Sequence, residues 1–133
     1  MKNYFKILGL IFLIPLAFSS CKDDENNGAS LVGTWEEVSF VSSGCVDPAD
    51  NESFTCTSAC ERIVVTSNTI TIDTEPVINY TVNGNQITAT QAFGGGTITF
   101  TVTFVVTETT LTITQQTDAS DGGCKNVTVY NRV

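Results

Sequence analysis

The sequence contains no histidine, few basic residues, and no apolar run long enough to cross a membrane. Without histidine, the chain lacks the commonest general base and the commonest metal ligand. Six Lys and Arg residues face fourteen Asp and Glu residues, which gives a formal net charge of −8. This balance argues against nucleic acid and anionic membrane surfaces as electrostatic partners. Lys, Arg and Ala are scarce while Thr is abundant, a composition that disfavours long helices.

The longest apolar run lies near the N-terminus and has the length of an export signal. A basic start, Met1–Lys6, is followed by the mostly apolar Ile7–Phe18 and then by two serines. A membrane-spanning helix needs about 20 apolar residues, so Met1–Ser20 predicts a cleaved signal peptide, with a buried N-terminal helix as the alternative. Cleavage would remove two of the six basic residues, leaving four against fourteen acidic residues and a net charge of −10.

Cys21 follows the two small residues and precedes an acidic tract. Ser19-Ser20-Cys21 resembles the lipobox of bacterial lipoproteins, in which the cysteine is acylated and becomes the first residue of the mature chain. Lys22–Glu25 resembles the signal that sends lipoproteins of one Gram-negative group to the outer face of the outer membrane. These resemblances imply a lipid anchor on Cys21 and an outer-membrane location facing the cell exterior. Residues 21–30 would then form a flexible acidic tether.

Residues 31–133 form one expected domain, built from short runs in which apolar and polar residues alternate. The clearest run is Thr97–Val106, and a period of two indicates a half-buried strand. Asn-Gly and Gly-rich breaks between the runs supply turn chemistry. The eight expected strands are Leu31–Ser42, Glu61–Thr66, Thr69–Asp73, Val77–Val82, Gln86–Phe93, Thr97–Val106, a run around Leu111–Thr114, and Cys124–Arg132.

This order of strands predicts an all-β fold, an eight-stranded antiparallel up-and-down barrel. Closure of the meander into a barrel removes exposed strand edges. A β-sandwich is the main alternative. No further domain boundary is expected after Ser30.

The two ends of the domain carry a motif that suggests a family. Leu31-Val32-Gly33-Thr34-Trp35 resembles the first-strand signature of lipocalins, and Arg132 matches the arginine that packs over that Trp from the last strand. A guanidinium on an indole face gains about 0.5–2 kcal/mol. The whole chain resembles small lipocalin-like lipoproteins of the same Gram-negative group, which usually have an apolar residue where this chain has Glu37. Two arrangements stay open: a bulge turns Val38 and Phe40 inward, or Glu37 points into the barrel.

The lipocalin resemblance implies a small apolar ligand held at the open end of the barrel. An eight-stranded barrel encloses one small ligand or is filled by its own side chains, so packing alone is the competing interpretation. A second hypothesis is a non-catalytic adaptor or structural lipoprotein with a packed core, whose loop Ser43–Cys60 contacts envelope proteins or glycans. The ligand-lining candidates are Ile70, Ile72, Ile78, Tyr80, Phe100, Val102, Phe104, Leu111 and Ile113.

Four cysteines remain if Cys21 carries lipid: Cys45, Cys56, Cys60 and Cys124. In an exported chain this even number predicts two disulfides, with three pairings possible. We rank the pairing that contains Cys56–Cys60 lowest. In the other two, Cys124 joins the last strand to the loop that follows the first. A thiolate metal site is the alternative use of these residues.

Residues that typically carry catalysis or bind cofactors are missing. With no histidine and with oxidised cysteines, Ser and Thr lack an activating base, so we expect no enzyme activity and no cofactor. Asp47, Asp50 and Glu52 do not have the spacing of a calcium loop, and we expect no metal. The expected partners are the membrane, through the lipid, and a small hydrophobic ligand, with a monomeric protein.

Overall fold

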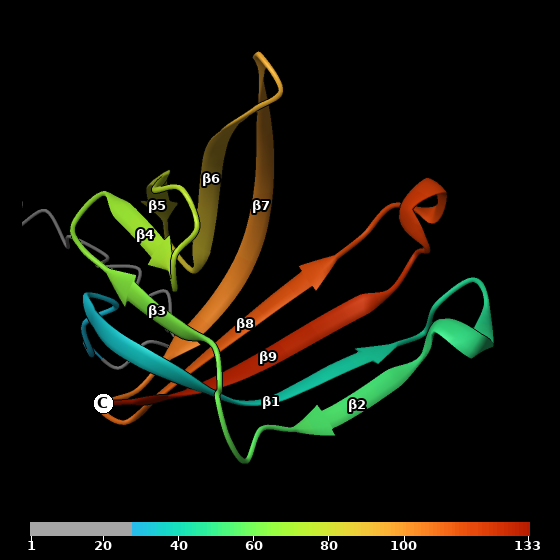
Figure 1. Cartoon of the computed structure of the whole chain (residues 1–133), viewed down its shortest axis with the longest axis horizontal. Coiled ribbons are helices and arrows are strands. Elements are labelled where there is room, and N and C mark those ends of the chain that lie inside the picture. The colour runs from blue at the N-terminus through green and yellow to red at the C-terminus, as the bar shows by residue number, and fades with distance from the viewer. Residues whose placement is uncertain (1–27) are drawn as a thin grey trace, which may run out of the picture.

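A computed structural model describes residues 28–133 of the chain, and within this range nearly all regular structure is β-strand (Figure 1). The expected signal peptide, Cys21 and most of the tether lie outside the described residues. The elements are β1 (Gly33–Ser43), η1 (Pro48–Asp50), β2 (Glu52–Thr55), β3 (Arg62–Val65), β4 (Thr69–Ile72), β5 (Ile78–Asn83), β6 (Gln86–Phe93), β7 (Gly96–Val106), β8 (Thr110–Gln116), η2 (Ala119–Asp121) and β9 (Lys125–Arg132).

The strands form a closed antiparallel barrel of eight strands. Strands β3 to β9 pair in chain order, β3 pairs with β1, and β9 pairs back with β1 over Trp35–Ser43. The all-β up-and-down barrel expected from the sequence is therefore confirmed, and the sandwich alternative is wrong. Hairpins are also confirmed where turn chemistry predicts them, such as Gly84, which adopts a φ of 61° between β5 and β6.

A ninth strand, β2, lies within the segment that the sequence suggested was a loop. The second half of β1 pairs with β2 over Ser39–Ser42, and the first half pairs with β3 over Gly33–Glu36. Two short strands thus share one side of a single long strand. All four residues of β2 are exposed, so no alternation of buried and exposed positions marks it in the sequence.

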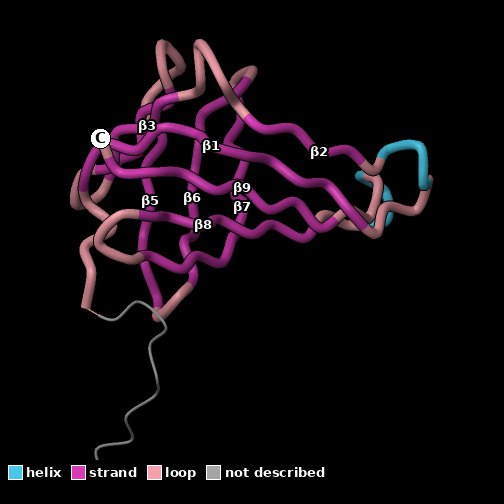
Figure 2. Tube along the Cα trace, turned by 90° about the horizontal axis from the view of Figure 1, so that it is seen from below, coloured by secondary structure: helices cyan, strands magenta, loops and turns pink. Residues whose placement is uncertain are grey.

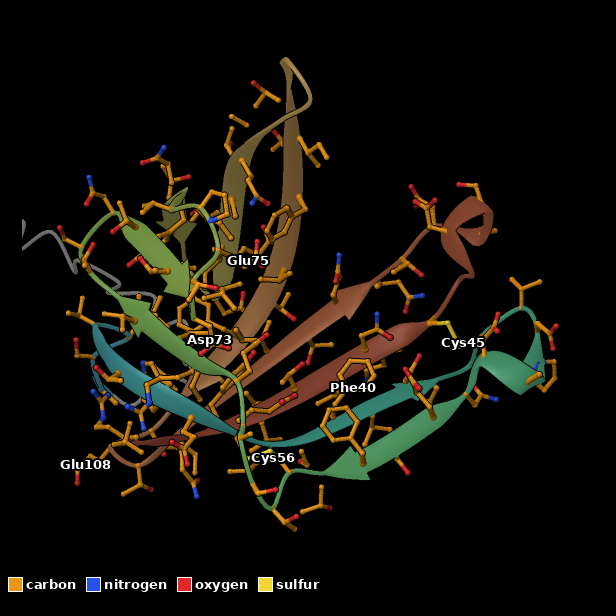
Figure 3. The ribbon with its side chains drawn as sticks, in the orientation of Figure 1. Phe40, Cys45, Cys56, Asp73, Glu75 and Glu108 are labelled. Atoms are coloured by element: carbon orange, nitrogen blue, oxygen red, sulfur yellow. A yellow bond between two sulfur atoms is a disulfide. The ribbon has the colours of Figure 1, made fainter. Side chains whose placement is uncertain are left out.

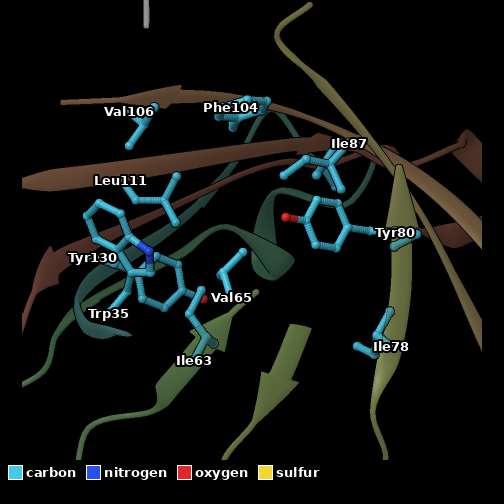
Figure 4. Close-up of a cluster of buried hydrophobic side chains, with 12 residues drawn as sticks. Trp35, Ile63, Val65, Ile78, Tyr80, Ile87, Phe104, Val106, Leu111 and Tyr130 are labelled. Carbon is cyan, nitrogen blue, oxygen red and sulfur yellow. The ribbon is translucent and has the colours of Figure 1, made fainter. Parts of the chain in front are cut away.

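The core fills one half of the barrel. Val102, Phe104 and Val106 of β7 are buried, whereas Thr101 and Thr103 between them are exposed. This alternation is what a period of two produces on a sheet with one wet face. Figure 4 shows the inward side chains meeting around Trp35, Leu111 and Tyr130. The buried hydrophobic cluster comprises Trp35, Ile63, Val65, Ile78, Tyr80, Ile87, Ala89, Val102, Phe104, Val106, Leu111 and Tyr130.

The other half of the barrel opens because β7 and β8 separate. These strands pair only where Thr103–Val106 meet Leu111–Thr114, whereas β6 and β7 pair along their whole length, from Gln86 opposite Thr103 to Phe93 opposite Gly96. The β6–β7 hairpin therefore diverges from a second arm formed by β8, β9, β1 and β2 (Figure 1). The short helices η1 and η2 both lie at the far tip of that second arm (Figure 2).

Two disulfides are present, and their pairing corrects the sequence prediction. Cys45 bonds Cys124 and Cys56 bonds Cys60, which is the pairing we ranked lowest. The reason is the pairing of β1 with β9, whose last pair is Ser43 with Lys125. This register places Cys45 and Cys124 side by side, with their Cα atoms 4.1 Å apart. Cys56 and Cys60 then close the short connection from β2 to β3.

Candidate functional site

The closed end of the barrel is sealed by Trp35 and Arg132. The Arg132 guanidinium carbon lies 4.0 Å from the centre of the Trp35 ring, as the sequence motif predicts. Trp35 is fully buried, and its indole Nε1 donates a hydrogen bond to the carbonyl of Leu31 at 3.0 Å. Arg132 also donates to the carbonyls of Ser30 (2.6 Å), Val32 (3.1 Å) and Glu108 (2.8 Å). The Arg132 side chain thus joins β9 both to the segment that precedes β1 and to the β7–β8 turn.

The glycine at position 33, two residues before Trp35, avoids a steric clash with Arg132. A Cβ atom built at Gly33 would overlap the Arg132 Nη1 atom. A side chain at this position would force the guanidinium to shift from its place over the indole ring. Gly33, Trp35 and Arg132 therefore form one structural unit, in which the glycine leaves space for the guanidinium that packs on the indole ring.

Glu37 reaches the inner face, and a bulge follows it. Glu37 stands opposite the buried Tyr130, and directly opposed residues of an antiparallel pair share a face. The register then shifts between Glu37 and Ser39, with Val38 as the extra residue. Because of this bulge, Phe40 and Ser42 lie on the same inner face as Glu37. They pair with Thr128 and Asn126 of β9. Parts of both arrangements left open by the sequence thus occur together: the bulge places Phe40 on the inner face, and Glu37 lies there too.

The environment of Glu37 disfavours its charged form. Burial raises the pKa of the Glu37 carboxyl above its ordinary value of 4.5, and repulsion from Glu61 raises it further. Tyr130 donates a hydrogen bond from its hydroxyl to Glu61 Oε1 at 2.8 Å. Burial raises the pKa of Tyr130 most, followed by the negative charge of Glu61. Two carboxylates and a phenol therefore lie together just above the sealed end.

We expect Glu37→Gln to stabilise the protein at neutral pH and not in acid. A carboxyl whose pKa is raised on folding destabilises the folded state as the pH rises. This unfavourable contribution is absent below pH 4.5, the ordinary pKa, and complete once the pH exceeds the raised value. Thermal unfolding of both proteins between pH 3 and 8 should give Tm curves that separate with rising pH. Glu75→Gln, at an exposed acid, is the control, and parallel curves for Glu37→Gln would contradict the assignment.

The nine ligand-lining candidates divide between the core and its border. Ile78, Tyr80, Val102, Phe104 and Leu111 are buried in the core cluster. The other four, Ile70, Ile72, Phe100 and Ile113, are partly buried and pack against it. Phe100 is the candidate that lies where β7 leaves β8. The candidates therefore share one inner face but extend from its packed end towards its open end.

A pocket of about 570 Å³ occupies the gap between β7 and the end of β8; we call it the split pocket. Ile98 and Phe100 lie on the same face of β7 as the buried Phe104. Ile98 is nonetheless 51% exposed, because β8 does not pair with this part of β7. The split pocket is lined by Ile98, Thr99, Phe100, Thr101, Gln115, Gln116, Thr117, Asp118 and Asp121.

A second pocket, of about 410 Å³, lies towards the tip of the other arm; we call it the tip pocket. Thr117 and Asp121 line both pockets, so the two adjoin. The Cys45–Cys124 disulfide and a hydrogen bond from Val46 N to Gly122 O (2.8 Å) hold the η1 and η2 loops together beside it. Figure 3 shows Cys45 at this tip and Phe40 farther along β1. The tip pocket is lined by Phe40, Ser42, Ala49, Asp50, Glu52, Thr117, Asp121, Gly122, Cys124 and Asn126.

The sequence did not allow us to predict the polar residues that line the open end. Ile98 belonged to an expected strand but not to the ligand-lining candidates, although its alternation with Phe100 was a sufficient signal. Asp50 and Glu52 have no spacing that marks a site in the sequence, and Asp121 and Asn126 carry no sequence signal. Within residues 28–133, no group of three or more His, Cys, Asp or Glu side chains is arranged to hold a metal ion.

Comparisons of the chain with known protein-family models, curated proteins and solved structures give no match. Its class therefore rests on its own geometry, a closed eight-stranded antiparallel barrel with one sealed end and one open end. In the described part of the chain, no helix has the length and apolar character needed to span a bilayer.

Proposed function

We propose that this protein is an outer-membrane lipoprotein, anchored through Cys21 and facing the cell exterior, whose lipocalin-like barrel binds a small apolar ligand at its open end. In this proposal the protein is a monomer without catalytic activity. Its partners are the membrane, through the lipid, and the ligand. The two disulfides fit an exported protein, since such bonds persist in oxidising compartments.

The observation that carries the ligand proposal is the separation of β7 from β8. The separation leaves Ile98 half exposed on the inner face, beside the split pocket. Large apolar side chains that remain exposed next to a concavity are typical of binding sites. At the sealed end, by contrast, the inward side chains belong to the buried core cluster.

Native mass spectrometry of the protein, released gently from the host envelope, tests this proposal. We expect an added mass that disappears on denaturation, on a polypeptide that carries an acyl modification and lacks four hydrogens for two disulfides. A polypeptide without acyl groups would contradict anchoring through Cys21. A bare mass without adduct would favour the alternative function, an adaptor or structural lipoprotein that contacts envelope proteins or glycans through its loops.

Substitutions on one face of β7 should separate binding from packing. Phe104 is 4% exposed in the core, and we expect Phe104→Ala to cost about 3–5 kcal/mol of stability. Ile98→Ala, at a half-exposed residue, should cost less than about 1 kcal/mol. Ile98→Ala should nevertheless weaken binding of a neutral apolar naphthylamine dye about tenfold, a change of about 1.4 kcal/mol. Dye titration and urea unfolding measure the two effects.

The exposed Val41→Ala, on the outer face of β1, is the matched control for Ile98→Ala. It should change neither dye affinity nor stability by a measurable amount. Equal dye binding by Ile98→Ala and the unmodified protein would contradict an apolar site between β7 and β8.

A further inference from the structure

Part of β7 presents an unpaired strand edge. β8 pairs with β7 only from Thr103 to Val106, whereas β6 pairs with β7 along its whole length. Within residues 28–133, no strand pairs with Thr97–Val102 on the side of β7 that faces away from β6. The β6–β7 hairpin also projects away from the rest of the barrel (Figure 1). A free edge of this kind is a template to which another strand can add.

The backbone groups of this edge point outward at every second residue. The N–H of Phe104 donates to the residue that precedes β6, and the N–H of Thr107 donates to the first residue of β8, each at 2.8 Å. This direction alternates along an antiparallel strand. The N–H and C=O groups of Thr97, Thr99 and Thr101 therefore point away from β6, towards the side that no strand covers.

The sequence of the hairpin does not protect this edge. Charged residues and proline commonly prevent edge strands from pairing with other chains, but residues 77–107 contain no Asp, Glu, Lys, Arg or Pro. The rest of the chain carries the charged residues that sum to a formal net charge of −8. Two copies therefore repel each other over most of their surfaces, but not where two of these hairpins meet.

The exposed stretch of β7 is also complementary to itself. Antiparallel pairing of two such edges about a twofold axis at Thr99 would set Thr97 opposite Thr101 of a second copy. It would also set Ile98 opposite Phe100. Directly opposed residues share a face, so the outward backbone groups pair while these two apolar side chains meet on the inner face. Ile98 is half exposed and Phe100 is partly buried, so both have surface left to bury.

We propose that the free edge of β7 is a self-association surface, at which a second copy of this chain adds its own β7 antiparallel about Thr99. The second copy then contributes Ile98 and Phe100 to the border of the split pocket, which the same residues line within one chain. The paired stretch, Thr97–Val102, is far shorter than the about 20–30 residues a side of a stable interface. The dilute protein therefore remains a monomer, as proposed above, and pairs form where copies are concentrated, as on a membrane.

Cysteine cross-linking of the full-length protein tests the pairing and its register. Thr97→Cys and Thr101→Cys, each alone, should give no disulfide-linked dimer under mild oxidation, because identical positions would lie roughly 13 Å apart along the strands. A mixture of the two proteins should give the dimer, because the two positions would lie directly opposite, about 5.5 Å apart. Non-reducing electrophoresis measures the linked fraction, which should rise with protein concentration.

Substitutions at the twofold axis test the backbone contact in the same mixture. Thr99→Pro, added to both proteins, removes an N–H that points away from β6, and it should abolish the cross-link without breaking the β6–β7 pairing. Thr99→Ala keeps the N–H and should leave the cross-link unchanged. Thr99→Glu sets two negative charges opposite each other and should abolish the cross-link as well. Thermal unfolding should give Thr99→Glu the Tm of the unmodified protein, since Thr99 is exposed.

Thr103→Cys is the control for random collision, because Thr103 is exposed on the same face of β7 but lies where β8 covers the edge. Thr103→Cys should not cross-link. Equal cross-linking of Thr103→Cys and of the Thr97→Cys and Thr101→Cys mixture would overturn the proposal, as would no cross-link in the mixture at any concentration. Neither result bears on the apolar ligand, because dye binding is measured on the dilute monomer.

Discussion

Replacement of Trp35 by alanine is expected to lower the free energy of unfolding by about 3–5 kcal/mol, the range found when large aromatic side chains are removed from cores. Trp35 is fully buried and lies at the centre of the sealed end. The substitution also removes the indole hydrogen bond to Leu31 and the face on which Arg132 packs. Arg132 would keep its hydrogen bonds to the carbonyls of Ser30, Val32 and Glu108 but would lose the ring on which it packs.

Urea unfolding followed by circular dichroism measures this loss. The chain contains a single tryptophan, so tryptophan fluorescence cannot report on the variant. Arg132→Ala in the same assay should cost less, because removing the arginine leaves the indole packed. If Trp35→Ala cost under about 1 kcal/mol, a typical surface effect, the sealed end would not be the stable part of the barrel.

Loss of the Cys45–Cys124 disulfide is expected to have the second large effect. This bond joins residues 79 positions apart, whereas Cys56–Cys60 spans only 4. In the chain-entropy description, the long loop contributes about 4–5 kcal/mol and the short loop about 2 kcal/mol. The difference arises because a cross-link over a longer segment restricts the unfolded chain more.

Paired substitutions test this comparison. Cys45→Ala with Cys124→Ala should lower the unfolding free energy about twice as much as Cys56→Ala with Cys60→Ala. The first pair should also disturb the tip pocket, because Cys124 lines it. Equal losses of stability from the two pairs would show that local strain or packing, and not loop length, governs their contributions.

The strands of the barrel were predictable because each one carries its own local signal. Thr97–Val106 alternates apolar and polar residues, and Asn83–Asn85 supplies turn chemistry. Both features depend on neighbours in sequence, and the structure confirms them as β7 and the β5–β6 turn. The Trp35–Arg132 contact joins distant residues, and its prediction came from the family resemblance.

Features without a local signal were missed or ranked wrongly. β2 forms because the second half of β1 needs a partner beyond the end of β3, and its exposed residues show no periodicity. The disulfide pairing depends on the β1–β9 register, which places Cys45 beside Cys124. The polar residues that line the open end come together only because of the position that the arm with η1 and η2 takes in the folded protein.

The sequence by itself determined that this chain forms short antiparallel strands and where their turns fall, because these depend on periodicity and turn chemistry, and the family resemblance added the residues that seal one end. Only the tertiary structure decided which cysteines pair, how Glu37 and the Val38 bulge coexist, and where the barrel opens. Those outcomes follow from strand register and from the separation of β7 from β8. Register and separation are set by the packing of all eight strands together, which no single segment encodes.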